Sequence, residues 1–402
     1  MTSTRSQAAG SNRPVHRRRA PEAFRKPSWR AAALVYLAVR GVGLAVLTVF
    51  ALTRPPGSET LRGVLAKWDG EWMLALAEHG YRGVPSSLTD AHGVHTAETG
   101  YAFFPGYPAV VGLVARIPGV SYFGAAWTLN LVFGVIAAVG IARLGALCVA
   151  RGRPAGDPVH AGLILVMLFA AAPMAVVLNM AYTEALFCML AAWALLFVLE
   201  HRWIEAGLCA LAVGLVRPTG IAVIVVVMLA ALLAHRDGPR AAAAFVLAPL
   251  GYLGFLGYVA VQTGSLTGWF RIQTAGWDTR FDFGAASLNF LHDAFTAPTT
   301  LADVVTGLVM VLTVGLLVWS VFDRLPWPVL LYGALVVASI LLSSGLMMSR
   351  ARLLLPAFVL LIPVAALLSR ARPIVAGTVL VPMIAASAVF GGYMLTVFQY
   401  AI

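Results

Sequence analysis

Long apolar runs separated by short breaks that carry arginines make up most of this sequence. Many of the runs reach the ~20 residues that a helix needs to cross a lipid bilayer. The pattern therefore predicts an all-α fold, a polytopic transmembrane bundle of about eleven helical segments. The expected segments cover residues 31–51, 122–149, 160–178, 181–199, 203–234 (a hairpin), 241–261, 301–322, 328–343, 353–368 and 374–398.

The positions of the basic residues orient this bundle. Arginines gather in the N-terminal tail and in the short breaks between apolar runs, and cytoplasmic loops are enriched in such residues. We therefore expect the N-terminus in the cytoplasm and two long polar segments, residues 52–121 and 262–300, on the outer face. Residues 1–30 are predicted to form a disordered basic tail, and residues 31–402 a single membrane domain. Abundant alanine and arginine with little lysine indicate a bacterium with a GC-rich genome, so the expected location is a bacterial plasma membrane.

Composition excludes several classes of protein. The chain is 60% hydrophobic and only 11% charged, whereas a soluble domain is about 25% charged. Its net charge of +11 follows the topology pattern, so we expect no nucleic-acid partner. Cys148, Cys188 and Cys209 lie within apolar runs and lack the spacing of metal ligands, so we expect no disulfide, no metal site and no cofactor.

The segment 68–81, WDGEWMLALAEHGY, is the most informative part of the first polar segment. If a helix covers residues 67–80, Trp68, Trp72 and Leu76 form one stripe along it. Tryptophans on such a stripe would lie at the membrane surface, where a sugar carried on a lipid can be reached. An amphipathic helix that only anchors the protein at the headgroups explains the stripe equally well.

The carboxylates of this helix divide between two faces. Glu71 and Glu78 are seven residues apart and share a face that can contact water. At about 100° per residue, Asp69 falls on the flank of the tryptophan stripe and points toward the membrane. Asp69 is therefore the carboxylate expected to act on a membrane-borne substrate.

Two further segments combine helix breaks with aromatic or charged side chains. Residues 101–117, YAFFPGYPAVVGLVARI, contain two X-Pro steps, which favour a segment along the membrane surface or a packing plug beneath the first helix. Arg217, in the break RPTG, lies deep in an apolar region, where an unpaired charge costs several kcal/mol. Next to a helix N-terminus it suits an anion such as a lipid phosphate. An internal ion pair with Glu184 is the alternative.

Other charged residues have both a structural and a functional interpretation. Glu184 can cap a helix N-terminus or contact the substrate. Arg40, near the middle of the bilayer, is expected to form a structural pair. Arg350 and Arg352, in an outer turn, can bind ordinary phospholipid or a substrate phosphate. Asp278 is expected to be a loop charge.

The blocks WDGEWMLALAEHGY with YAFFPGYP, AYTEALF, GLVRPTG and SRARLLLPAF, in this order, resemble the PIG-V family. That family comprises the second GPI mannosyltransferase and its bacterial relatives in the GT-C fold. The resemblance implies an inverting mannosyltransferase that uses polyprenyl-phosphate mannose, with its site in the first outer loop and Asp69 at the position of the family's Trp-Asp carboxylate. Relatives usually carry a bulkier apolar residue at the position of Gly106. The resemblance therefore does not give the shape of the acceptor pocket.

The chemistry of the residues agrees with a glycosyltransferase. Transfer from a lipid phosphate needs a base for the acceptor hydroxyl and a cation for the departing phosphate. Asp69 is predicted to be the catalytic base and Arg217 the cation, without a metal. The expected partners are a polyprenyl-phosphate sugar donor, membrane lipids and a glycolipid or protein acceptor. The predicted substrate-binding residues are Trp68, Trp72, His79, Phe104, Tyr107, Tyr182, Glu184, Arg217, Arg350 and Arg352.

A membrane transporter and a non-catalytic scaffold are the two alternatives to a glycosyltransferase. A membrane transporter of a lipid-linked or small anionic substrate would show paired internal repeats with matching broken helices, but only the break at Arg217 is evident. A non-catalytic membrane scaffold would leave that arginine unexplained.

Overall fold

A computed structural model describes residues 26–152 and 156–401 of the chain. The regular secondary structure of this part is helical apart from one isolated antiparallel bridge between Phe281 and Ser343, so the all-α prediction is confirmed. Most of the predicted disordered tail, residues 1–25 of 1–30, lies outside the described residues. The α-helices are α1 (Trp29–Leu52), α2 (Leu61–Ala66), α3 (Asp69–His79), α4 (Gly106–Val114), α5 (Tyr122–Arg151), α6 (Pro158–Ala170), α7 (Glu184–Leu199), α8 (Trp203–Val213), α9 (Ile221–Leu233), α10 (Pro239–Leu247), α11 (Leu250–Thr263), α12 (Gly268–Trp277), α13 (Ala285–Thr296), α14 (Leu301–Phe322), α15 (Trp327–Leu341), α16 (Arg350–Leu353), α17 (Ile362–Arg370) and α18 (Pro373–Thr396). The 3₁₀ helices are η1 (Thr99–Ala102), η2 (Ala175–Asn179), η3 (Pro218–Gly220), η4 (His235–Asp237), η5 (Met347–Ser349) and η6 (Leu355–Leu361).

The length of the apolar helices explains the bundle. In the part of the chain that the structure describes, α1, α5, α14, α18 and the pair α10–α11 make five helices long and apolar enough to cross a membrane. A sixth span consists of Met347–Leu353 and Leu355–Arg370, which are bent by 52°. Shorter apolar helices, among them α6, α7 and α15, pack between them. The chain is a multi-pass membrane protein.

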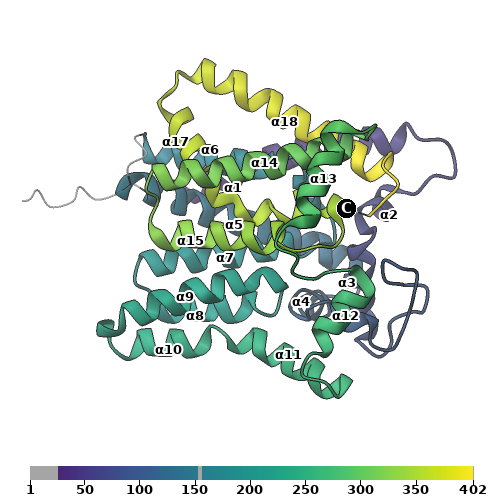
Figure 1. Cartoon of the computed structure of the whole chain (residues 1–402). Helices are drawn as coiled ribbons and strands as arrows, with labels where there is room; N and C mark the ends of the chain where they lie inside the picture. The colour runs from purple at the N-terminus through teal and green to yellow at the C-terminus, as the bar shows by residue number, and fades with distance from the viewer. Residues whose placement is uncertain (1–25, 153–155, 402) are drawn as a thin grey trace, which may run out of the picture.

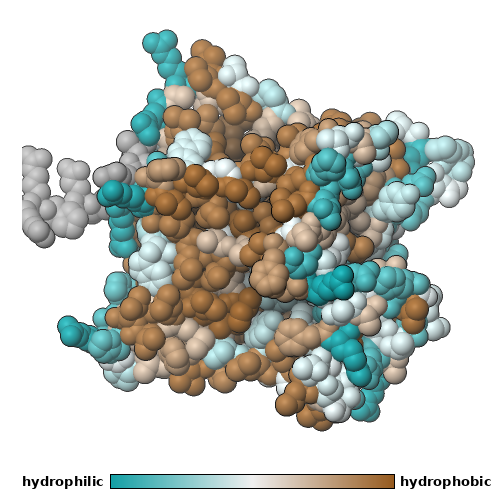
Figure 2. All heavy atoms as spheres, in the orientation of Figure 1, coloured by the Kyte–Doolittle hydropathy of each residue, from teal (hydrophilic) through white to brown (hydrophobic). Residues whose placement is uncertain are grey.

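The bundle has two polar ends and an apolar middle. In Figure 1 the long helices lie side by side, with α3 and α12 at the right and the α9–α10 turn at the left. Figure 2 shows a hydrophobic band between two hydrophilic ends. Exposed apolar side chains in the bundle, such as Leu312 and Val381, suit contact with lipid tails. We call the end with α3 and α12 the cavity end, and the end with the α9–α10 turn, which carries Arg236 and Arg240, the basic-turn end.

The prediction of one helix over residues 160–178 is wrong. α6 ends at Ala170, and the 3₁₀ turn η2 follows after a break. Pro173 accounts for this end, because a proline disfavours helical backbone at the residue before it. The chain then turns inside the bundle, where Tyr182 is 1% exposed and Glu184 begins α7 with 0% exposure.

The first polar segment folds into short helices at the cavity end. The predicted helix over residues 67–80 corresponds to α3, but its predicted start is wrong, because α3 begins at Asp69. Trp68 precedes it with a φ of 55°, which is costly for a residue with a side chain and stops the helix from extending backward. Trp72 and Leu76 lie on one buried face of α3, packed inside the protein and not at the membrane surface where the stripe was expected.

The short helix α4 packs against α3. Its 9 residues are too few to cross a membrane, which agrees with the expected packing plug. The backbone N–H of Gly106 donates to the carbonyl of Leu215 at 2.7 Å. A Cβ at Gly106 would lie only 2.8 Å from that oxygen. This close approach joins α4 to the break between α8 and η3, and any larger residue at this position would push the two apart.

Candidate active site

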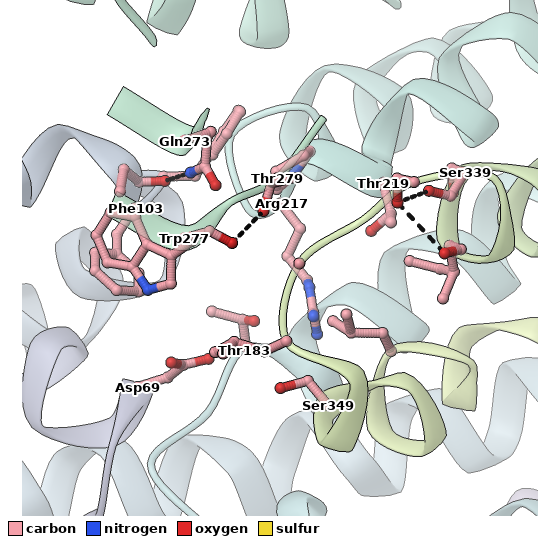
Figure 3. Close-up of a pocket in the computed structure, with 18 of the residues that line it drawn as sticks. Asp69, Phe103, Thr183, Arg217, Thr219, Gln273, Trp277, Thr279, Ser339 and Ser349 are labelled. Atoms are coloured by element: carbon pink, nitrogen blue, oxygen red, sulfur yellow. Dashed lines mark hydrogen bonds between the residues drawn. The ribbon is translucent and has the colours of Figure 1, made fainter. Parts of the chain in front are cut away.

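A cavity of about 410 Å³ at the cavity end is lined by residues from distant parts of the sequence. Figure 3 shows Arg217 reaching into it from one side, with Asp69 and Ser349 on the other. The wall is built by α3, the η1–α4 turn, the α8–η3 break, α12 and the turn between α15 and α16. None of these elements would form the cavity alone.

Asp69 is the first residue of α3, where a negative charge interacts favourably with the helix dipole. Its Oδ2 lies 2.6 Å from Nη1 of Arg352, and its side chain is 36% exposed. Arg352 is buried, and its guanidinium lies over the ring of Tyr182, 4.9 Å from the ring centroid. The base predicted from the sequence and a cation are therefore in direct contact.

Glu184 connects two arginines from behind the cavity wall. Its Oε1 lies 2.5 Å from Nη1 of Arg217 and 3.8 Å from Nε of Arg352. The internal ion pair given above as an alternative for Arg217 is therefore present, and Arg217 also lines the cavity. An uncompensated charge at such a buried position would be costly, so Glu184 offsets part of the cost of burying these guanidinium groups.

Arg350 has a different set of partners. Its Nη2 donates to the carbonyls of Ser343 at 2.5 Å and Ser344 at 2.9 Å, and its Nη1 contacts the carbonyl of Ile340. These carbonyls belong to the last turn of α15 and the residues after it, which lack helical partners. Arg350 thus caps α15 and fixes the turn that forms one side of the cavity.

The charged side chains that line the cavity are mainly positive. They are the guanidinium groups of Arg217, Arg350 and Arg352 and one carboxylate, that of Asp69, an excess of two formal positive charges. The carboxylates of Glu184 and Asp282 lie outside the wall, near Arg217 and Arg350. A low-dielectric cavity with this excess favours an anionic ligand.

No protein-family model matches the chain. A segment of 173 residues is 34% identical to GPI alpha-1,6-mannosyltransferase 2 of Mus musculus and 32% identical to the protein of that name from Homo sapiens. Each match covers 40% of this chain and 31% of the mammalian protein, so the chain spans about a third of the length of these relatives. The similarity to the second GPI mannosyltransferase inferred from the sequence blocks is confirmed on this segment.

A solved structure extends the comparison to most of the chain. ArnT from Cupriavidus metallidurans, whose crystal structure contains undecaprenyl phosphate, superposes with a TM-score of 0.50 and 13% sequence identity. The superposition covers 90% of this chain and 76% of ArnT. The fold is of the GT-C type. This confirms the predicted fold class, and the low identity carries nothing beyond the fold.

The structure brings most of the predicted site residues together. Glu184 lies directly behind the wall, in contact with Arg217. The predicted residues in the wall itself are Asp69, Phe104, Tyr182, Arg217, Arg350 and Arg352.

Besides Glu184, four predicted residues lie outside the cavity wall. Trp72 supports it from behind, stacked on Phe103 with ring centroids 5.0 Å apart. Tyr107 is fully buried, and its hydroxyl lies 3.4 Å from the carbonyl of Ala126. Trp68 lies beside Lys67, with the ammonium 5.5 Å from its ring centroid. His79 is exposed beside Glu78 at the far end of α3.

The sequence analysis missed the aromatic side chains of the second polar segment. Trp269, Gln273 and Trp277 of α12 all line the cavity. Their spacing of four residues places them on one face of a helix, the same spacing that indicated a stripe at Trp68 and Trp72. The signal was therefore present in WFRIQTAGW, but nothing in the sequence says that the two polar segments meet.

Arg40 is buried in α1 without entering the cavity wall. Its Nε donates to Oδ1 of Asn179 at 3.2 Å, and its Nη1 donates to the carbonyl of Ala170 at 3.0 Å. The expected structural partner is thus a pair of neutral oxygens, one at the end of α6 and one at the end of η2. Across residues 26–152 and 156–401, no group of three or more His, Cys, Asp or Glu side chains could hold a metal ion.

Proposed function

We propose that this protein is a membrane glycosyltransferase that moves mannose from polyprenyl-phosphate mannose to a hydroxyl of a glycolipid or protein. The observation that carries the proposal is the contact of a carboxylate with buried arginines in one cavity, Asp69 with Arg352 and, through Glu184, with Arg217. The 173-residue similarity to mammalian mannosyltransferases and the GT-C fold support the same class of reaction.

In the proposed reaction Asp69 accepts the proton of the acceptor hydroxyl as that oxygen attacks the anomeric carbon of the donor sugar. The bond between the anomeric carbon and the phosphate oxygen breaks, and its electron pair leaves with the phosphate. Arg217 and Arg352 stabilise the negative charge on the departing phosphate. One displacement inverts the anomeric configuration, and the two arginines supply the positive charge, so we propose a metal-independent reaction.

A second cavity supports a lipid carrier as the donor. It has a volume of about 610 Å³ and is lined almost entirely by apolar side chains of α14, η6 and α18. Several of these side chains, such as Leu312 and Val389, are exposed on the bundle surface, so a lipid can enter from the membrane. Ala351 lines this groove, whereas its neighbours Arg350 and Arg352 line the charged cavity. A polyprenyl chain in the groove would bring its phosphate to Arg352.

The donor is tested with purified protein in detergent, labelled polyprenyl-phosphate mannose and an extract of cell envelope. We expect labelled product from the wild type and none from Arg217→Ala. Arg217→Lys should retain part of the activity, because a point charge persists while the bidentate fork is lost. Arg202→Ala, which removes an exposed arginine at the basic-turn end, serves as the matched control.

Two results would contradict this proposal. Transfer from a nucleotide sugar with no transfer from the polyprenyl donor would exclude the donor class. Wild-type turnover in a folded Arg217→Ala protein would leave that arginine a structural role only. The acceptor is identified by mass analysis of envelope lipids and glycoproteins from cells that lack the gene.

A further inference from the structure

One wall of the cavity is aromatic rather than charged. Trp269, Gln273 and Trp277 come from one face of α12, and Phe103 and Phe104 come from the η1–α4 turn. In Figure 3 Phe103 and Trp277 lie on the same side of the cavity as Asp69, away from Thr219 and Ser339. The aromatic wall therefore adjoins the base and not only the periphery of the cavity.

Packing fixes the orientation of these rings. Phe103 stacks on Trp72 at 5.0 Å and meets Trp277 edge to face at 5.6 Å. Phe104 meets Trp269 edge to face at 5.7 Å. Nε2 of Gln273 donates to the carbonyl of Ala102 at 2.9 Å, which ties α12 to η1. Because each ring is held by a neighbour, the wall presents a preformed surface to a ligand.

Besides arginine nitrogens, three uncharged buried polar groups in the cavity wall have no hydrogen-bond partner within the described parts of the chain. They are Nε1 of Trp269, the hydroxyl of Tyr182 and the hydroxyl of Thr219, on side chains exposed by 7%, 1% and 9%. A buried donor without a partner is unfavourable, and native proteins contain few of them. Their presence around one cavity points to a ligand that brings its own hydroxyl groups.

We propose that this aromatic wall is a subsite for a hexose ring, a role that rests on the glycosyltransferase function proposed above. A pyranose ring has a face of C–H bonds and a rim of hydroxyl groups. The C–H face suits the negative face of Trp277 or Phe103, and the rim suits Nε1 of Trp269, which comes from the same helix as Trp277. An apolar aromatic surface with a few convergent polar groups is the usual build of a site for a small ligand. The ring belongs either to the donor or to the acceptor, since both must lie within reach of Asp69.

Saturation-transfer NMR with methyl α-mannoside at millimolar concentration tests the subsite directly on the full chain in detergent. We expect ring-proton signals with the wild type. Trp277→Leu should weaken binding about tenfold through loss of the ring face, and Trp269→Phe several-fold through loss of one donor. The matched control is Trp319→Leu, on α14 and outside the cavity wall, which should bind as the wild type does. No signal with the wild type, or equal binding by Trp277→Leu, would overturn the proposal.

Competition distinguishes the two sources of the ring. Displacement of the mannoside by polyprenyl-phosphate mannose, but not by polyprenyl phosphate, assigns the subsite to the donor sugar. Retention of the mannoside in the presence of either lipid assigns it to the acceptor. Displacement by polyprenyl phosphate alone would overturn the subsite, because the mannoside would then occupy the charged end.

The subsite and the proposed reaction fail in different ways. Transfer from the labelled donor without mannoside binding contradicts the subsite only. Mannoside binding that depends on Trp277, without transfer from any polyprenyl donor, supports the subsite and contradicts the proposed donor.

Discussion

The two ends of the bundle contain ion pairs of the same residue types, built in opposite ways. At the basic-turn end Arg202 pairs with Glu205 three residues along the same helix, and their side chains are 48% and 42% exposed. At the cavity end Arg217 pairs with Glu184 from another helix, with exposures of 10% and 1%. Both pairs are short, at 2.7 Å and 2.5 Å. Distance alone therefore does not distinguish them, whereas burial does.

This difference distinguishes charges that follow the expected membrane orientation from charges that form a functional site. An exposed ion pair contributes about 0–1 kcal/mol to stability, and the basic residues at that end follow the pattern expected of cytoplasmic turns. Buried charges carry a large desolvation cost, which well-packed apolar residues would avoid. Charges kept inside an apolar bundle at such a cost, and exposed to a cavity, indicate a functional site.

The largest expected contrast concerns the side of the membrane on which each end lies. The Ser86→Cys variant carries an exposed cysteine at the cavity end, which should react with an impermeant thiol reagent in intact cells. A cysteine at Arg236→Cys, exposed at the basic-turn end, should react only after lysis, since arginine-rich turns face the cytoplasm. The native Cys148 and Cys188 are buried and Cys209 is half-buried, so labelling of the unsubstituted protein sets the background. The reverse labelling pattern would place the cavity in the cytoplasm.

The next effect isolates one carboxylate of the cavity end. Asp69→Asn keeps the size of the side chain and one oxygen acceptor but cannot take a proton. We expect transfer to fall about 10²–10⁴-fold while binding of the donor persists, measured by turnover and by donor binding on the same preparation. Glu71→Gln and Glu78→Gln, which change exposed carboxylates of the same helix, should stay near the wild type. Activity in Asp69→Asn together with its loss in Glu71→Gln would put the base on the other face of α3.

The smallest expected effect compares the stability of the two kinds of ion pair. Glu184→Ala leaves the buried Arg217 without its carboxylate, whereas Arg352 keeps Asp69, and should lower the free energy of unfolding by about 3–5 kcal/mol. Glu205→Ala should lower it by less than about 1 kcal/mol. Thermal unfolding of the two variants in the same detergent gives the comparison. Equal destabilisation would show that burial does not determine how much each ion pair contributes to the free energy of unfolding.

Much of the fold could be predicted because membrane helices follow from local pattern. The runs at residues 31–51 and 301–322 became α1 and α14 within two residues at each end. The prediction of one helix over residues 160–178 failed for an equally local reason. Pro173 ends the helix early, but the continuous apolar pattern was given more weight than this proline. The start of α3 was missed for another reason, since a positive φ at Trp68 leaves no trace in the sequence.

The sequence by itself determined the membrane class, the helix break at Arg217 and the residue types able to do the chemistry, because hydrophobic length, proline breaks and charges in apolar runs are local properties. Only the tertiary structure decided which of these residues meet. Asp69 and Arg352 are 283 residues apart, yet their side chains are in contact, and α12 of the second polar segment completes a cavity begun by the first. Such contacts depend on how the helices pack around one another, and the packing surface of each helix is set by all its neighbours at once. The sequence therefore identifies charged and aromatic residues of the site, but their arrangement depends on the packing of the whole bundle.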